Sequence, residues 1–304
     1  KKEYDQLKKH QSDLITPKQL QSVTKKGRGA LPIIWLTNTH KFDAEIAGRK
    51  VKTTWGDIRF EDWIGEGLNP NGESKDSEGS EFLQQVFAKD DDRPIYVQAW
   101  GGPITMVQAL YRFKQKHGEE KLRKLMAKLH IFGIHLQDIT FDFMIKLDDV
   151  KTHGCLNMGD TKSTYNGERY NPGWFLLDEG HFWKYIGAMK QQEVNGHGPM
   201  SNIYDHGGEG DTPAFLYLIS AALGLNDPAD PTMGSWGTMF KKMEGPFPDR
   251  YYSTCKVDVN ELLRWVPDAK NSFLNRLQWS LKSPQGGNHD PVAAIGTDRG
   301  NQFL

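Results

Sequence analysis

Between residues 77 and 136 the chain alternates helix-type and strand-type segments, and this order constrains the fold more than any other feature of the sequence. Apolar residues recur at helical spacing after Ser77 and again after Thr105. Short apolar runs at 95–100 and 131–136 read as buried strands. Helix, strand, helix, strand is typical of a parallel sheet with helices packed against it. The sequence therefore predicts an α/β fold, with a mostly parallel sheet and helices on both of its faces.

Sheets of this kind bind ligands beyond the carboxyl ends of their strands. The two strand predictions therefore nominate residues 100–105 and 135–142 as ligand-binding segments. Two glycine-rich stretches, 56–79 and 195–210, contain too much glycine to pack as core. We expect them to be mobile loops that form the rim of a cleft.

Weaker patterns add a few elements to this outline. Short strands are predicted at 32–36 and 50–54, and a helix is predicted at 182–189. Asp211, Thr212 and Pro213 have the order of a helix start, with an acidic cap and a proline in the first turn, and an apolar helix should follow over 214–223.

Charge and cysteine content exclude several classes of protein. The 304 residues contain 38 Lys and Arg and 39 Asp and Glu, a net charge of -1, and the two signs are interspersed. No long-range field draws such a chain to nucleic acid or to anionic lipid. No apolar run approaches the roughly 20 residues that span a bilayer. We therefore expect neither nucleic-acid nor membrane partners, and the oligomeric state stays open. Cys155 and Cys255 are too few for a disulfide framework, so free thiols are expected.

Aromatic residues are frequent, with nine Trp, ten Tyr and fifteen Phe, and several stand next to glycine. Examples are Trp55, Trp100 and Trp236, each of which directly precedes a glycine. Flat rings on loops suit stacking on sugars or bases, but tryptophan is also a common core residue to which glycine gives room. Both interpretations stay open.

Glu209 and Asp211 alternate with glycines directly before the predicted helix at 214–223. Two carboxylates on such a framework suit a hard cation, which takes several oxygen ligands and accepts backbone carbonyls among them. A plain helix cap beside a solvated glutamate fits the same residues. The spacing alone does not decide between the two.

Several segments, in the same order along the chain, resemble the nucleoside-hydrolase-like domain known from cellulose-binding proteins. They are 74–83 (SKDSEGSEFL), 100–102 (WGG), 137–138 (QD), 197–199 (HGP), 209–218 (EGDTPAFLYL), 224–228 (GLNDP), 234–237 (GSWG) and 288–289 (NH). Together they extend over most of residues 1–291. The resemblance implies a nucleoside-hydrolase-like fold for 1–287, and it implies that 288–304 leads into a β domain of immunoglobulin-like type.

The resemblance also implies a site. In true nucleoside hydrolases a calcium ion is held partly by a threonine carbonyl in a Gly-Pro-Leu-Thr turn and by an aspartate at the start of a late helix. Thr105 in the similar run 102–105 (GPIT) and Asp211 match these two ligands. Hydrolysis of a glycosidic bond passes through an oxocarbenium-like transition state that carboxylates stabilise. We therefore expect Asp138 and Glu209 to be catalytic. The residues expected to bind substrate are Asp76, Glu78, Trp100, Gln137, Asp142 and Trp236.

Two departures from the family pattern bear on activity. Gly210 stands where classical members place a histidine, and no cluster of closely spaced aspartates precedes Tyr4. We therefore expect residues 1–287 to lack the first metal-binding strand of the domain, so that this stretch alone would not hydrolyse a substrate. The pair His289 and Asp290 is an alternative catalytic pair, although no buried helix follows it.

The function inferred from the sequence is that of a hydrolase with a bound divalent cation, Ca²⁺. Its expected partner is a carbohydrate or a nucleoside-like small molecule, and its expected location is secreted or periplasmic. The alternative is a non-catalytic carbohydrate-binding domain on the same fold, because fold resemblance does not choose between the two.

Overall fold

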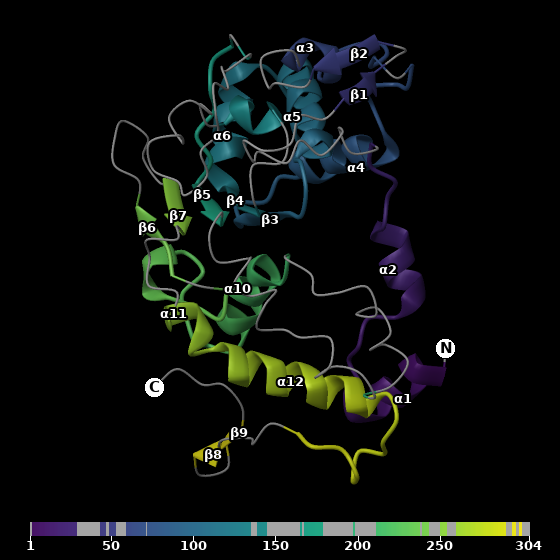
Figure 1. The fold of residues 1–304 in the computed structure, drawn as a ribbon, viewed down its shortest axis with the longest axis vertical. Coiled ribbons are helices and arrows are strands. Elements are labelled where there is room, and N and C mark those ends of the chain that lie inside the picture. Colours follow the sequence, from purple (N-terminus) through teal and green to yellow (C-terminus); the bar gives the residue numbers. More distant parts are fainter. Residues whose placement is uncertain are drawn as a thin grey trace. The chain divides into compact units, whose positions relative to one another are not determined.

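The computed structural model in Figure 1 divides the chain into two compact units. Unit 1 comprises residues 1–20, 181–240 and 256–304, and unit 2 comprises residues 21–180 and 241–255. The structure describes residues 2–28, 43–46, 49–52, 59–70, 72–134, 139–144, 165, 167–178, 197, 211–237, 239–242, 250–253, 260–289, 294–295 and 298–299.

A five-stranded sheet in the order β3-β4-β5-β7-β6 forms the centre of unit 2. Its four parallel strands are β3 (Ile95–Ala99), β4 (Leu129–Ile134), β5 (Trp174–Asp178) and β7 (Arg250–Ser253). The short edge strand β6 (Lys241–Lys242) pairs antiparallel with β7. The prediction of an α/β fold with a mostly parallel sheet is confirmed, and the two predicted strands in this region are β3 and β4.

The two helices predicted in this region are α4 (Glu78–Phe87), which precedes β3, and α5 (Ile104–His117), which follows it. A further helix, α6 (Glu119–Lys128), leads into β4. Ser77 caps α4, because its side chain accepts from the Ser80 amide while the Ser80 hydroxyl accepts from the Ser77 amide. Gly118, at φ 85°, allows the sharp turn between α5 and α6.

The predicted loop at 56–79 is partly a core element, which corrects the sequence analysis. Its described part contains α3 (Phe60–Trp63) and an isolated bridge between Leu68 and Ser74. Phe60, Trp63 and Ile64 are 2–3% exposed and belong to the same core as the helices of unit 2. The many glycines hid this short run of apolar residues, so the expectation that 56–79 does not pack as core is wrong for 60–64.

A hairpin of β1 (Asp43–Ile46) and β2 (Arg49–Lys52) accounts for the strand predicted at 50–54. The strand predicted at 32–36, the helix predicted at 182–189 and both cysteines lie outside the described residues. So does the loop predicted at 195–210, apart from His197.

Unit 1 is built around α10 (Thr212–Ala222) and α12 (Val266–Trp279). Leu216, Trp236, Val266 and Ala269 form its apolar centre. The other elements of its described part are α1 (Lys2–His10), η4 (Pro231–Met233), α11 (Asn260–Leu263) and the pair β8 (Ala294–Ile295) and β9 (Asp298–Arg299). Helix α2 (Pro17–Val23) crosses from unit 1 into unit 2. No described helix is long and apolar enough to cross a membrane.

Candidate functional site

The carboxyl edge of the parallel sheet is the first place to look for a ligand. Ala99 pairs with Gly133 across β3 and β4, and Gly133 pairs with Leu177 across β4 and β5. The next residues along these strands, Trp100 and Asp178, therefore stand at the same level of the edge. Two strand spacings, roughly 10 Å, separate their backbones. That separation matches the size of one or two sugar rings.

Trp100 ends β3 with 53% of its surface exposed. The preceding residue, Ala99, is buried, and the following Gly101 has φ 129°, a conformation that favours glycine. The chain thus leaves the sheet directly after the indole and presents it at the strand end. This is the position in which the sequence analysis expects a substrate-binding tryptophan.

Asp178 is a candidate that the sequence analysis missed. It is fully buried at the end of β5, where it pairs with Ile134 of β4 and Ser253 of β7. A signal was present in the sequence, because the apolar run 174–177 (WFLL) ends on this carboxylate. The rule that nominated 100–105 also nominates the residue after that run.

Thr105 lies in the first turn of α5. Residues 26–28 connect it to the start of α4 through hydrogen bonds. The amide of Arg28 donates to Thr105 Oγ1 at 3.2 Å, and the amide of Gly79 donates to the Lys26 carbonyl at 2.8 Å. A Cβ on Gly79 would lie 3.1 Å from Thr105 Cγ2 and 3.2 Å from that carbonyl, so only glycine fits without a shift. The described surroundings of Thr105 are thus the Arg28 amide at its hydroxyl and the backbone of Gly27 and Gly79.

Glu78 and Asp76 precede α4, and both have protein partners. Glu78 Oε2 accepts from the Lys26 amide at 3.3 Å, and its Oε1 lies 3.4 Å from the ammonium of Lys25. Asp76 accepts from Arg112 at 2.6–3.1 Å, and this guanidinium holds the pKa of Asp76 below its usual range. A substrate role for either residue stays a prediction, and the contacts point first to anchoring of the α4 start.

Gln108 on α5 also holds the segment before α4, through hydrogen bonds made in the protein interior. It is fully buried, and its amide both accepts from the Gly65 amide at 2.9 Å and donates to the Gly65 carbonyl at 2.8 Å. The same amide group donates to Asp76 Oδ1 at 2.7 Å. One side chain on α5 therefore holds both the turn after α3 and the segment before α4.

Replacing Gln108 with leucine is expected to lower the free energy of unfolding by about 2–4 kcal/mol, because it leaves the buried amide and carbonyl of Gly65 without these partners. Urea unfolding followed by circular dichroism measures the change. The control is Gln85→Leu, an exposed position on α4, which should cost less than about 0.5 kcal/mol. Equal losses in the two variants would show that the Gln108 contacts contribute little.

Asp142 lies in the interior and not at a ligand surface. It is fully buried in η2 (Ile139–Phe143), where its carboxylate accepts from Arg169 at 3.1 and 3.2 Å and from the Tyr165 amide at 3.0 Å. A substrate contact for Asp142 stays a prediction. The visible role is to join η2 to the segment at 165–169.

The remaining predicted site residues fall in unit 1 or outside the described residues. Asp211 occupies the N-cap position of α10, but its side chain makes no capping hydrogen bond, and burial raises its pKa. Trp236 is only 9% exposed, and its backbone amide donates to Ser220 Oγ at 3.3 Å, so the core interpretation of this tryptophan fits best. Gln137, Asp138 and Glu209 are outside the described residues.

The described residues do not by themselves fit a calcium site. Within the described ranges no group of three or more His, Cys, Asp or Glu side chains could hold a metal ion. The one described hydrogen-bond partner of the Thr105 hydroxyl is the backbone amide of Arg28, which is a donor and not a cation ligand. Thr105 and Asp211 belong to different units. Calcium binding through them stays a prediction, as does their convergence with Asp138 on one cleft.

Comparisons with known proteins agree with the fold. Residues 1–240 match the family described as "Cellulose-binding Sde182, nucleoside hydrolase-like domain". A solved structure of a nucleoside hydrolase-related hypothetical protein from Saccharophagus degradans, described as associated with carbohydrate metabolism, aligns with 98% of this chain at 24% identity and a TM-score of 0.61. The chain covers 62% of that structure's length. No curated protein matches the chain. The expected nucleoside-hydrolase-like fold is confirmed.

Proposed function

Because the chain belongs to the family of cellulose-binding, nucleoside hydrolase-like domains, we propose that it binds a carbohydrate at the carboxyl edge of its parallel sheet. The observation that carries the proposal is Trp100, an indole more than half exposed directly after the edge strand β3. A sugar ring has an apolar face of C–H groups that packs against an indole, while its hydroxyls need polar partners.

Asp178 stands two strands along the sheet from β3, at the same level as Trp100, but its side chain is fully buried. The hydroxyls therefore need other polar partners at this edge. The family description favours a β-linked glucan as the first ligand to test.

Hydrolysis of a glycosidic or N-glycosidic bond is a second proposal, favoured by the nucleoside hydrolase-like description of the family. Asp211 at the start of α10, whose pKa burial raises, is the described carboxylate to substitute when turnover is tested. A secreted or periplasmic location belongs to the same proposal, because cellulose, which the family description names, lies outside the cytoplasm.

Replacing Trp100 with alanine is expected to weaken binding of a soluble gluco-oligosaccharide about tenfold, since a lost ring contact costs about 1–1.5 kcal/mol. Isothermal titration measures the affinity. The same samples, incubated with aryl glycosides and nucleosides, test for turnover.

Leu68→Ala provides the matched control, because Leu68 is 66% exposed in the same unit but lies away from the strand ends. It should bind like the wild type. If Trp100→Ala is folded by circular dichroism and binds with unchanged affinity, the ligand does not bind at the carboxyl edge.

A further inference from the structure

Unit 2 contains a cavity of about 970 Å³ whose lining does not include Trp100 or Asp178. It is lined by α3, by the last turns of α5 and the start of α6, and by Phe143 and Tyr165. Tyr111 and Gln115 on α5 lie six and ten residues beyond Thr105, which is roughly 9–15 Å along the helix. A ligand here would therefore be separate from one held at Trp100.

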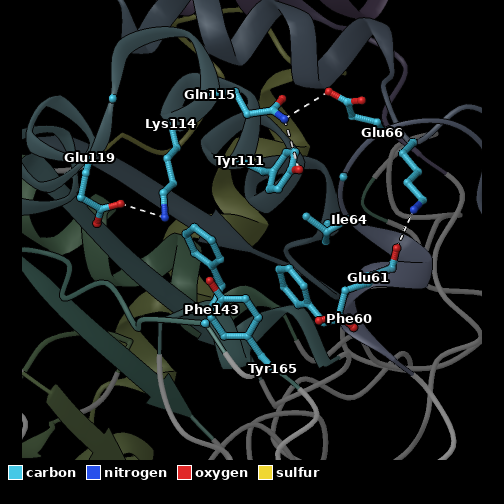
Figure 2. Close-up of a pocket in the computed structure, with 14 residues that line it drawn as sticks. Phe60, Glu61, Ile64, Glu66, Tyr111, Lys114, Gln115, Glu119, Phe143 and Tyr165 are labelled. Carbon is cyan, nitrogen blue, oxygen red and sulfur yellow. Dashed lines mark hydrogen bonds and ion pairs between the residues drawn. The ribbon is translucent and has the colours of Figure 1, made fainter.

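Aromatic rings form one wall of this cavity, which we name the α3–α5 pocket. In Figure 2 the rings of Phe60, Phe143 and Tyr165 lie together. The Phe60 and Tyr165 centroids are 4.4 Å apart, and those of Phe143 and Tyr165 are 5.7 Å apart. Phe60 and Phe143 are buried and serve as the base. Tyr165 and Tyr111 are only half-buried, so they retain ring surface for a ligand.

Most charges that line the pocket are neutralised by the protein. Lys114 pairs with Glu119 at 2.8 Å, on the side of the pocket opposite Glu66 in Figure 2. Glu66 lies 3.3 Å from Arg112 and also accepts from Gln115 at 3.2 Å. Glu61 is exposed, so water solvates its carboxylate at the rim.

Lys75 is different. It is 8% exposed, and its ammonium donates to the backbone carbonyl of Glu61 at 2.5 Å. Within the described part of the chain, no carboxylate lies in ion-pair distance of this ammonium. Burial lowers the pKa of Lys75, and the charge of Arg28 acts in the same direction, while the carboxylates of Asp62 and Glu61 oppose the shift from beyond ion-pair distance. A buried ammonium of this kind is stabilised by an incoming anion.

We propose that the α3–α5 pocket binds an acidic sugar, with the ring against Tyr165 and Tyr111 and the carboxylate on Lys75. A uronic acid combines the required features: a ring with an apolar face, hydroxyls for Gln115 and Glu61, and one negative charge. The proposal rests on carbohydrate binding as the function of the chain. It adds a second site and a class of ligand.

The test compares a uronic-acid trisaccharide with its methyl ester, which keeps the rings and removes the charges. The wild type should bind the acid at least about tenfold more tightly than the ester, because a charge-assisted hydrogen bond is lost with the ester. Lys75→Gln should abolish this preference while its amide can still donate to the Glu61 carbonyl. Lys75→Arg should retain it. Lys116→Met, an exposed lysine on α5, should behave as the wild type.

A wild type that binds acid and ester equally overturns the proposal, even if a Lys75 variant fails to fold. An unchanged preference in Lys75→Gln overturns it as well, since Lys75 then only caps the end of α3. Titrations with a neutral glucan and with Trp100→Ala separate the two sites. If the protein binds glucan through Trp100 but shows no preference for the acid, only the inference about the α3–α5 pocket is contradicted. If it binds neither sugar, the proposed carbohydrate-binding function is contradicted as well.

Discussion

Replacing Asp142 with alanine is expected to lower the free energy of unfolding by about 3–5 kcal/mol, the range for breaking a buried ion pair from one side. The Arg169 guanidinium would lose its carboxylate, and the Tyr165 amide would lose its acceptor. Because Tyr165 also forms a wall of the α3–α5 pocket, the variant should bind acidic sugar weakly even where it is folded.

Urea unfolding measures the change, with Asp90→Ala as the control. Asp90 is exposed in the same unit, so its removal should cost less than about 0.5 kcal/mol. If Asp142→Ala were as stable as the wild type but did not bind glucan, the structural role would be contradicted. Asp142 would then be the substrate-binding residue that the sequence analysis expected.

The second large effect is expected at Gly237. A Cβ at this position would lie 2.1 Å from the Pro213 carbonyl and 2.8 Å from the Tyr217 amide, both in the backbone of α10. Backbone cannot move aside as a flexible side chain can, so Gly237→Ala should cost about 3 kcal/mol or more. The turn that carries Trp236 would be pushed off α10.

Thermal unfolding checks this expectation against Gly286→Ala. At Gly286 the nearest atom to an added Cβ is Ser283 Oγ at 3.5 Å, an ordinary contact. Gly286→Ala should therefore unfold at nearly the wild-type temperature. If Gly237→Ala also unfolded near the wild-type temperature, the inference that this turn packs closely on α10 would be contradicted.

Local patterns in the sequence were sufficient for part of unit 2. The apolar run at 95–100 and the helical spacing after Ser77 and Thr105 predicted β3, α4 and α5, because burial on one face imposes those periods. The capping box at Ser77 is encoded within four residues, so it could be predicted as well.

Contacts between distant residues could not be predicted in this way. Asp142 follows a strand and looked like a ligand-binding carboxylate, but its partner Arg169 lies 27 residues away in a polar stretch. Asp76 was expected to bind substrate because it lies on the loop before a helix, where a role in the helix N-terminus fitted as well; Arg112 and Gln108 of α5 donate hydrogen bonds to it. Isolated carboxylates in a sequence do not reveal whether a buried cation already pairs with them.

The α3–α5 pocket was hidden for another reason. Its wall combines Phe60 from a stretch predicted to be a loop with Phe143 and Tyr165 from segments without a clear periodic pattern. Glycine-rich surroundings at 56–79 masked the short apolar run at 60–64. Only the fold brings these rings together.

The central claim, that a carbohydrate binds at the carboxyl edge of the parallel sheet, is tested most directly by a crystal structure with a gluco-oligosaccharide. The account predicts a sugar ring packed against the indole of Trp100. A sugar bound elsewhere in unit 2, with Trp100 free of it at saturating concentration, would contradict the claim.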